Sequence, residues 1–433
     1  MLSIEQFERA QSWPRSQRVE LYFDLECFPY QRDVVDDPAQ KKAWNAARRS
    51  GKTTVAGAIP AVRAIEVPGS ESAVFAPSAT QAKRMFEATK EYLERATRGI
   101  EGLSIAKDNE TEYRLNTGSK VFCATLGSDT ARGAGPECIV IDEAAHGVTE
   151  ETLNRVVRPM TLTHDDYEII ATSTPLGKTS VFYDITRPES TWSAHHATAY
   201  ENPKADRDEL AALREELDEI SFSMEYLAEF ADDGSSYLPE SLVDPCVASS
   251  GTSLTPTPGA FTWLLVDPAR HGADHSAYLA IDERGVVFHT ETVPRESVPL
   301  TVDKTRSLDE RFGFGTVLVD ASAGASDVAT REFSNCSSMK FSTKRKESYY
   351  QTLRRLLEAG ALTLPDSEES ALVDELTNLG FDFTTDGLLR VHARGNARDD
   401  LADALAMGAY ALDRDIRVSL SYSGTQAQLH SSA

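Results

Sequence analysis

Short apolar runs alternate with amphipathic stretches along the first half of the chain. Residues 72–77 (SAVFAP), 138–143 (CIVIDE) and 167–173 (YEIIATS) are apolar, rich in β-branched side chains and bounded by polar residues, which predicts buried strands. Residues 80–98 repeat apolar positions with the period of a helix. Strands that alternate with helices are typical of a parallel sheet, so we predict an α/β fold here.

The second half has a different rhythm. Residues 261–267, 276–282 and 286–293 are apolar runs in quick succession, and a Glu-Arg-Gly turn joins the last two. This spacing predicts three antiparallel strands. A further strand is predicted at 316–322, and after more helical segments a final helix at 398–412.

Composition marks the boundary between the two halves. Residues 246–262 are rich in Ser, Thr, Gly and Pro, which predicts a linker. We therefore divide the chain into a domain at 1–245, the linker at 246–262, a second domain at 263–415 and a polar, flexible tail at 416–433. The sequence contains no repeat with a period of 20 to 50 residues.

The net charge of −24, from 44 basic and 68 acidic residues among 433, works against a partner as acidic as DNA. Acids occur along the whole chain, and arginine outnumbers lysine by 31 to 13. This pattern favours adaptation to high salt over an ordinary acidic cytosolic enzyme. At about 1 M salt the Debye length is about 3 Å, so local basic contacts would decide DNA binding. Candidate contacts are Arg132 and the run Lys344, Arg345, Lys346.

Several classes of protein are disfavoured. No apolar run approaches the roughly 18 residues that span a bilayer, and the N-terminal residues lack the layout of a signal peptide, so we expect a soluble intracellular protein. The five cysteines are scattered and form no CxxC pair, which argues against a zinc site or a disulfide framework. We expect them to be buried small residues.

Residues 46–54 (AARRSGKTT) approach the phosphate-binding P-loop pattern, although Ala46 stands where the pattern has its first glycine. Gly51 would let backbone amides approach phosphate, Lys52 would reach the β and γ oxygens, and the Thr53 hydroxyl would contact Mg²⁺. We expect ATP to be bound by this loop. Its predicted contacts are Ser50, Gly51, Lys52, Thr53 and Thr54.

Two further strands carry polar residues to the same predicted sheet edge. Asp142 and Glu143 end an apolar strand, and ligands of open α/β sheets bind at such carboxyl ends. We expect Asp142 to hold Mg²⁺ and Glu143 to deprotonate the attacking water. The alternative is a strand that merely ends in two solvated acids. Thr172, with Ser173 and Thr174, would sense the γ-phosphate, unless this segment is a plain exit from strand to turn.

Two other residues are candidates for nucleotide contact. Arg48 lies inside the loop, where a guanidinium would stabilise charge on the transferred phosphoryl group, or it is a surface arginine. Gln31 follows an aromatic residue and a proline, a typical setting for a glutamine that reads adenine. Arg132 would contact either nucleotide or DNA.

The second half carries carboxylates at corresponding places. Asp267 and Asp320 each end an apolar strand, and Asp399, Asp400 and Asp403 begin the last helix, where Asp403 shares a face with the other two. Acids packed this closely need cations, which predicts two divalent ions, Mg²⁺ or Mn²⁺, for phosphodiester hydrolysis. Taken singly, each is also compatible with a strand end or a helix N-cap. Asp274 is a candidate auxiliary ligand, and His271 and His275 are expected to be solvated.

In this order, the arginine-bearing P-loop, IDEAAH, ATSTP, VDPARHGAD, LVDAS and DDLADALA resemble the large terminase subunit of tailed viruses over about residues 20 to 412. The resemblance implies a RecA-like ATPase domain that drives DNA translocation, followed by an RNase H-like nuclease domain. By it, Lys52, Asp142 and Glu143 serve ATP hydrolysis, the Ser-Thr-Pro tract at 173–175 couples hydrolysis to movement, and Asp267, Asp320 and the acids at 399–403 bind the nuclease metals. The residues we expect to be catalytic are Glu143, Arg48, Asp267, Asp320 and Asp400.

The resemblance also implies partners and a location. These are double-stranded viral DNA, a portal protein, a small terminase subunit and a pentamer on the procapsid, with a monomer as the alternative in solution. The protein would act in the host cytoplasm, with no membrane and no secretion, and acidity points to a halophilic archaeal host. A DNA helicase or repair translocase with an appended nuclease is the alternative enzyme, and an ATP-dependent scaffold is the non-enzymatic one.

Overall fold

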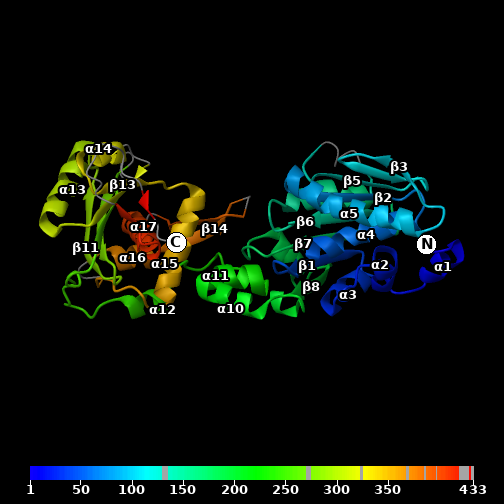
Figure 1. The fold of residues 1–433 in the computed structure, drawn as a ribbon, viewed down its shortest axis with the longest axis horizontal. Coiled ribbons are helices and arrows are strands. Elements are labelled where there is room, and N and C mark those ends of the chain that lie inside the picture. The colour runs from blue at the N-terminus through cyan, green and yellow to red at the C-terminus, as the bar shows by residue number, and fades with distance from the viewer. Residues whose placement is uncertain are drawn as a thin grey trace. The chain divides into compact units, whose positions relative to one another are not determined.

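The computed structural model describes residues 1–128, 135–269, 275–321, 325–366, 370–384, 387–395, 397–418 and 429–430. The chain forms two compact units, shown as ribbons in Figure 1. The first consists mainly of residues 1–212 and 220–232, and the second mainly of 213–219, 233–384 and 388–433. Each unit is an α/β structure, as the sequence predicts.

The first unit is built on an eight-stranded sheet with the order β3-β4-β5-β2-β6-β7-β1-β8. From β5 to β8 all neighbours are parallel, whereas β3, β4 and β5 pair antiparallel. The strands are β1 (Lys41–Ala46), β2 (Glu71–Ala76), β3 (Ile105–Asp108), β4 (Glu112–Leu115), β5 (Lys120–Thr125), β6 (Cys138–Asp142), β7 (Glu168–Ser173) and β8 (Ser193–Ala197).

Helices cover this sheet because its central strands are apolar on both faces. Trp44 and Val74 belong to the core beneath the N-terminal helices. That group comprises α1 (Ile4–Ala10), α2 (Arg15–Phe23), α3 (Pro29–Asp36), α4 (Lys52–Glu66) and α5 (Ala79–Gly99). Ser78 caps α5, since its hydroxyl accepts the N–H of Gln81, and the helix agrees with its predicted range within one residue.

Short helices follow β6, β7 and β8. They are α7 (Glu150–Thr152), the π-helical turn η1 (Leu153–Val157), α8 (Arg158–Thr161), α9 (Val181–Thr186) and η2 (Ala199–Glu201). The chain then forms α10 (Arg207–Glu216), α11 (Glu219–Phe222) and the π-helical turn η3 (Ser223–Leu227).

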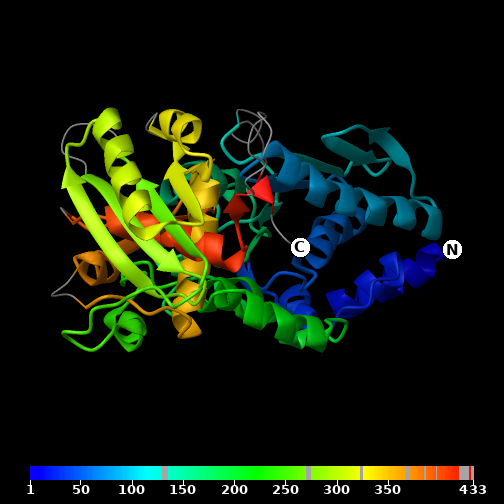
Figure 2. The same ribbon diagram turned by 60° about the vertical axis from the view of Figure 1, so that its left-hand side comes forward.

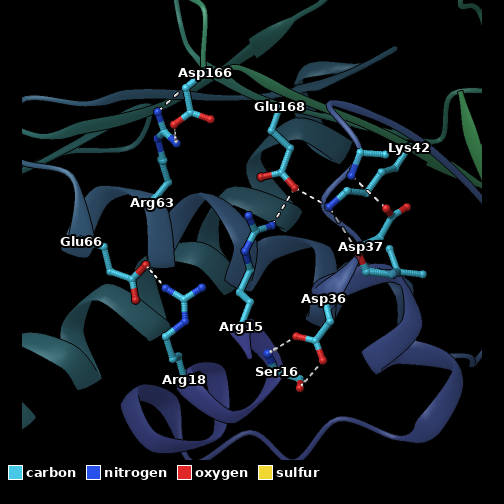
Figure 3. Close-up of polar contacts among 12 residues, drawn as sticks. Arg15, Ser16, Arg18, Asp36, Asp37, Lys42, Arg63, Glu66, Asp166 and Glu168 are labelled. Carbon is cyan, nitrogen blue, oxygen red and sulfur yellow. Dashed lines mark hydrogen bonds and ion pairs between the residues drawn. The ribbon is translucent and has the colours of Figure 1, made fainter. Parts of the chain in front are cut away.

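A buried ion-pair cluster joins the N-terminal helices to the sheet (Figure 3). Glu168 of β7 accepts hydrogen bonds from Arg15 of α2, at 2.6 Å, and from Lys42 of β1, at 2.5 Å. The Lys42 side chain is fully buried. Nearby, both carboxylate oxygens of Asp36 bind Ser16, one to its N–H and one to its hydroxyl. These contacts hold α2 and α3 against the strands that lead to the phosphate loop.

The second unit contains a five-stranded sheet with the order β11-β10-β9-β12-β13. The first three strands form the predicted antiparallel meander, and β9, β12 and β13 are parallel. Its strands are β9 (Thr262–Asp267), β10 (His275–Asp282), β11 (Val287–Pro294), β12 (Thr316–Asp320) and β13 (Cys336–Met339). Two smaller pairings join β14 (Leu379–Phe383) to β15 (Leu389–Ala393) and β16 (Arg417–Val418) to β17 (Leu429–His430).

Alternation along β9 assigns its side chains to two layers. Leu264 and Val266 pack in one core with Leu308 and Ala329, whereas Leu265 faces the opposite layer. There a Cβ added to Gly408 would lie 3.2 Å from Leu265, so α17 approaches the sheet closely. Figure 2 shows α17 running along the strands. The helices are α12 (Glu240–Val243), η4 (Asp244–Cys246), α13 (Val298–Phe312), α14 (Ala325–Glu332), α15 (Thr343–Glu358), α16 (Leu372–Thr377) and α17 (Asp400–Asp413).

The change of unit comes earlier in the sequence than the predicted boundary at 245/246. Residues from Asp233 onward belong to the second unit, where the N–H of Tyr237 donates to Leu379 O at 3.0 Å. The segment expected as a linker is also bonded there, because Ala248 N donates to Leu364 O at 2.9 Å and Thr257 N to Asp282 Oδ2 at 2.8 Å. Its Ser/Thr/Pro composition therefore reflects irregular backbone on the second unit rather than a free connection. The expected tail at 416–433 lies largely outside the described residues.

All five cysteines are buried and unpaired. Within the described ranges, no helix combines the length and apolar character needed to cross a membrane.

Candidate functional site

The phosphate loop lies between β1 and α4 and has the backbone that its sequence requires. Arg49 and Gly51 both have positive φ, 62° and 77°, so the chain turns sharply before α4 begins at Lys52. The first N–H groups of a helix have no partner within it, and here they follow the turn directly. The Lys52 side chain is buried, and its Nζ lies 3.5 Å from Ala46 O. Loop, helix start and ammonium together form an anion-binding arrangement.

Gln31 supports this loop from below. Its Nε2 donates to Ser50 O at 2.9 Å, and its Oε1 accepts the N–H of Phe28 at 2.9 Å. Tyr30 donates its hydroxyl to the same Ser50 oxygen at 2.7 Å. A Cβ on residue 51 would lie 2.9 Å from Gln31 Nε2, so only glycine fits this contact without a shift. The structure thus gives the Gln31 amide protein partners; its reading of adenine stays a prediction and would require these bonds to be exchanged.

Buried oxygen atoms from three adjacent segments have no hydrogen-bond partner among the described residues. They are Ser50 Oγ, Asp142 Oδ1 and Thr172 Oγ1. Asp142 pairs with Thr172 in the sheet, and Thr172 also pairs with Trp44 of β1, which leads into the loop. A buried polar group without a partner costs about 1–3 kcal/mol. Oxygens of this kind are ligands suited to Mg²⁺ and to phosphate, so the residues present fit a magnesium–nucleotide complex.

Asp142 ends β6 and is almost fully buried. Burial raises its pKa to about 7, with a further contribution from the charge of Glu143, while Lys52 acts in the opposite direction. The carboxylate is therefore held where its negative charge is costly unless a cation joins it. This electrostatic setting is the one expected for a cation ligand.

Glu143 adopts a left-handed backbone conformation, with φ of 51°. For a residue other than glycine this is a strained conformation, and such residues cluster at functional sites. Its Oε2 accepts the Ser173 hydroxyl at 3.3 Å and lies 3.7 Å from His146 Nε2. Burial lowers the pKa of His146, against the influence of Glu143. The Glu143 carboxylate is thus oriented by two neighbours beside the phosphate loop.

Arg48 forms a bidentate ion pair with Glu225 of η3. Its backbone N–H donates to Glu225 O at 2.7 Å. Thr53 is half-buried and Thr54 is exposed at the start of α4. Arg132 lies outside the described residues, so the structure does not place it.

A second group of acids lies in the other unit. Asp267 ends β9 and Asp320 ends β12, and the parallel register that pairs Val266 with Val319 brings the two acids to neighbouring strand ends. Both side chains are buried. Asp274 and His271 lie outside the described residues.

The beginning of α17 brings three more acids to this region. A cavity of about 270 Å³ is bordered by Asp267, Asp399, Asp400 and Asp403, together with His275 and Lys346. His275 borders the cavity as a half-buried residue, and its Nδ1 lies 2.8 Å from a guanidinium nitrogen of Arg398. Asp320 is not part of the cavity wall, although it ends the strand beside Asp267.

Lys346 contacts two of these acids. Its Nζ lies 2.8 Å from Asp403 Oδ2 and 3.5 Å from Asp399 Oδ2. Tyr350 donates its hydroxyl to the other oxygen of Asp403 at 2.5 Å. Across the described part of the chain, no group of three or more His, Cys, Asp or Glu side chains is arranged to hold a metal ion. The donor set suits Mg²⁺ or Mn²⁺ in chemistry, and an ammonium lies among its members.

Sequence reasoning missed the residues that position the predicted ones. The sequence suggested Lys346 as a DNA contact, yet its side chain faces the acids, while Lys344 and Arg345 are exposed. A helical period would have placed Lys346 and Tyr350 on one face. Glu225 gave no local signal, because its partner Arg48 lies 177 residues away.

Comparison with known proteins gives a consistent result. Residues 44–244 match the family described as "Terminase large subunit, T4likevirus-type, N-terminal". The chain is 22% identical over 428 residues to the large terminase subunit of Thermus phage G20c, covering 85% of this chain and 84% of that protein. It is 24% identical over 409 residues to that of Escherichia phage T5, covering 88% and 89%. The structure of a large terminase from a thermophilic bacteriophage matches with a TM-score of 0.53 at 12% identity, over 89% of this chain and 99% of that one, which shows a common fold.

Proposed function

The chain belongs to the large terminase subunit family, and on that basis we propose that its first unit is an ATP-driven DNA-packaging motor and its second a metal-dependent endonuclease. The observation that carries the first assignment is the set of unpaired buried oxygens beside the Lys52 loop. A structure of the large terminase from the thermophilic bacteriophage contains ADP. A helicase would need a second RecA-like domain, whereas the second unit has an antiparallel meander and strand-end acids.

The chain's own residues divide the work of ATP hydrolysis. Backbone amides at the start of α4 and the Lys52 ammonium hold the phosphates and offset their charge. Thr53 and Asp142 would hold Mg²⁺, which supplies charge neutralisation when bound. Glu143, fixed by Ser173 and His146, accepts a proton from the attacking water. Arg48 stabilises the transferred phosphoryl group after leaving Glu225.

In the second unit, Asp267, Asp320 and the acids at the start of α17 would hold the metal ions. Two ions bound there would activate a water molecule and stabilise the leaving oxygen of the phosphodiester. The protein's contribution is to bring Asp267 and the acids of α17 to one cavity, with Asp320 at the neighbouring strand end. Gly408 permits this by letting α17 approach β9. The substrate is double-stranded viral DNA, and the partners are a portal protein, a small terminase subunit and further copies of this chain in the host cell.

Two substitutions test the motor assignment. Lys52→Ala should weaken both ATP binding and hydrolysis, because it removes the charge that holds the phosphates. Glu143→Gln should keep ATP binding but reduce turnover by at least about a hundredfold, as loss of a general base does. Equilibrium binding of a fluorescent ATP analogue and steady-state phosphate release measure the two effects.

The matched controls are Lys83→Ala and Glu110→Gln, which alter an exposed ion pair of the same unit. Both should leave binding and turnover unchanged. Wild-type turnover in the Glu143→Gln protein would refute the assignment of the base.

A further inference from the structure

We propose that Lys346 is the internal counter-ion of the nuclease site: its ammonium occupies a cation position among the acids in the metal-free protein and must be displaced before metal binds. This inference rests on the nuclease function proposed above and adds a residue that controls metal loading. It makes Lys346 a positioning residue for Asp399 and Asp403 in the metal-free state.

The Lys346 side chain lies among acids and aromatic rings. Lys346 lies in the first turn of α15 and directs its Nζ toward Asp403, at 2.8 Å, and Asp399, at 3.5 Å. Its ammonium is also 5.6 Å from the ring centres of Phe341 and Tyr350, within the range of cation–π contacts. Two acids and two aromatic rings thus hold one ammonium, and the side chain forms part of the cavity wall.

The acids around Lys346 need a positive charge to balance them. The acids at the start of α17 and at the end of β9 repel one another, and Asp403 is buried. Without a counter-charge such a group would be strongly destabilising. The Lys346 ammonium, in direct contact with Asp403 and Asp399, offsets part of the repulsion that a metal ion would otherwise relieve.

Lys346 differs from the neighbouring lysines in its exposure and its contacts. Lys340 and Lys344 are exposed, so they can meet DNA without disturbing the acids. Asp403 has both carboxylate oxygens engaged, one by Lys346 and the other by Tyr350. A metal ion that binds Asp403 must share these oxygens with both donors, and the positive charge of the Lys346 ammonium repels it at this distance. Metal affinity is consequently reduced for as long as the ammonium keeps its place among the acids.

The test compares metal binding and stability in the full-length protein. Lys346→Gln removes the charge, Lys346→Arg keeps it, and Lys340→Gln removes the same charge from an exposed site nearby. All proteins carry Asp142→Asn, so that the other predicted metal ligand does not contribute. Calorimetric titration with Mn²⁺ without nucleotide measures affinity, and thermal unfolding in EDTA and in Mn²⁺ measures stability.

We expect Lys346→Gln to bind Mn²⁺ about tenfold more tightly, or about 1.4 kcal/mol, because the competing cation is gone. The same variant should unfold at a lower temperature in EDTA and recover in Mn²⁺. Lys346→Arg and Lys340→Gln should keep the wild-type affinity.

Unchanged or weaker Mn²⁺ affinity in Lys346→Gln would overturn the inference. So would an equal loss of stability in EDTA and in Mn²⁺, which would indicate a purely structural role. If the protein with native Lys346 binds no Mn²⁺ and the otherwise unaltered chain cuts no DNA with it, the nuclease proposal itself fails. Cleavage by that unaltered chain combined with unchanged affinity in Lys346→Gln would refute the counter-ion role alone.

Discussion

Replacing Glu168 by glutamine should destabilise the sheet that carries the phosphate loop. The change preserves the shape of the side chain but removes the negative charge shared by Arg15 and Lys42 (Figure 3). Lys42 cannot turn to solvent, because its side chain is fully buried in β1. The variant therefore leaves a buried ammonium in the first unit without the carboxylate that it contacts.

The size of the effect follows from burial. Breaking a buried ion pair by removing one partner costs about 3–5 kcal/mol. The Arg15 side chain keeps 27% of its exposure and can be partly solvated, so we expect the lower end of this range, about 3 kcal/mol. Glu189→Gln alters a pair whose side chains are 50% and 70% exposed, and should cost less than about 1 kcal/mol.

Hydrogen exchange measured by mass spectrometry reports the first unit separately. About 3 kcal/mol corresponds to roughly a hundredfold faster exchange of the most protected amides in peptides that cover β1 and β7. Adding Lys42→Met to Glu168→Gln should restore part of the protection, because the uncompensated ammonium is removed. Exchange within about threefold of wild type in Glu168→Gln would refute the reasoning.

The same ion pair has a defined pH dependence. Burial by itself raises the pKa of Glu168, but the charges of Arg15 and Lys42 outweigh it and hold the pKa below its ordinary value of 4.5. A carboxyl whose pKa is depressed by folding stabilises the protein above its unfolded-state value. The difference in the free energy of unfolding between wild type and Glu168→Gln should have its full size above pH 4.5 and should decrease as the pH falls further. A difference that grows on acidification would contradict this sign.

Two further outcomes are expected. In the full-length protein, Asp267→Ala or Asp320→Ala should abolish Mn²⁺-dependent plasmid cleavage, because each removes a ligand of the proposed nuclease metals. ATP hydrolysis should stay intact, because the ATPase residues lie in the other unit. Wild-type cleavage by Asp320→Ala would exclude Asp320 as a ligand of these metals. The midpoint of thermal unfolding should rise as KCl approaches molar concentration, because screening relieves the self-repulsion of a −24 chain, and a flat or falling midpoint would count against adaptation to high salt.

The sequence predicted well which acids of the two proposed sites lie at the ends of strands. Asp142, Asp267 and Asp320 each end an apolar run, and the structure has them at the ends of β6, β9 and β12. A fully buried strand must be apolar, so the first carboxylate after it marks the sheet edge. The seven strands named from the sequence agree with β2, β6, β7, β9, β10, β11 and β12 to within two residues, and three of them form the antiparallel meander of the second unit.

The partners of these acids could not be predicted because they depend on tertiary packing. Three adjacent cations at 344–346 are equivalent in the sequence, and only the rotation of α15 turns Lys346 toward Asp403. Gln31 matched a nucleotide-contact pattern, yet its amide is bonded to Ser50 and Phe28. The Ser/Thr/Pro segment resembled a linker, although backbone hydrogen bonds fasten it to the second unit. A composition rich in Ser, Thr and Pro therefore indicates a segment without helix or strand, but it does not indicate whether that segment is hydrogen-bonded to the rest of the unit.

The two proposed sites differ in how their acids are kept before a ligand arrives. In the first, Asp142 has an oxygen without a partner among the described residues, and Lys52 influences its pKa from a distance, so a cation can join without breaking a hydrogen bond to that atom. In the second, Asp403 has both oxygens bonded, and Lys346 already supplies a positive charge. Ligand binding gives a partner to a buried oxygen in the first unit, whereas in the second unit it must compete with the contact between Lys346 and Asp403. For the proposed motor and nuclease, this difference predicts that the first unit binds its metal ion at concentrations that leave the nuclease site largely unloaded.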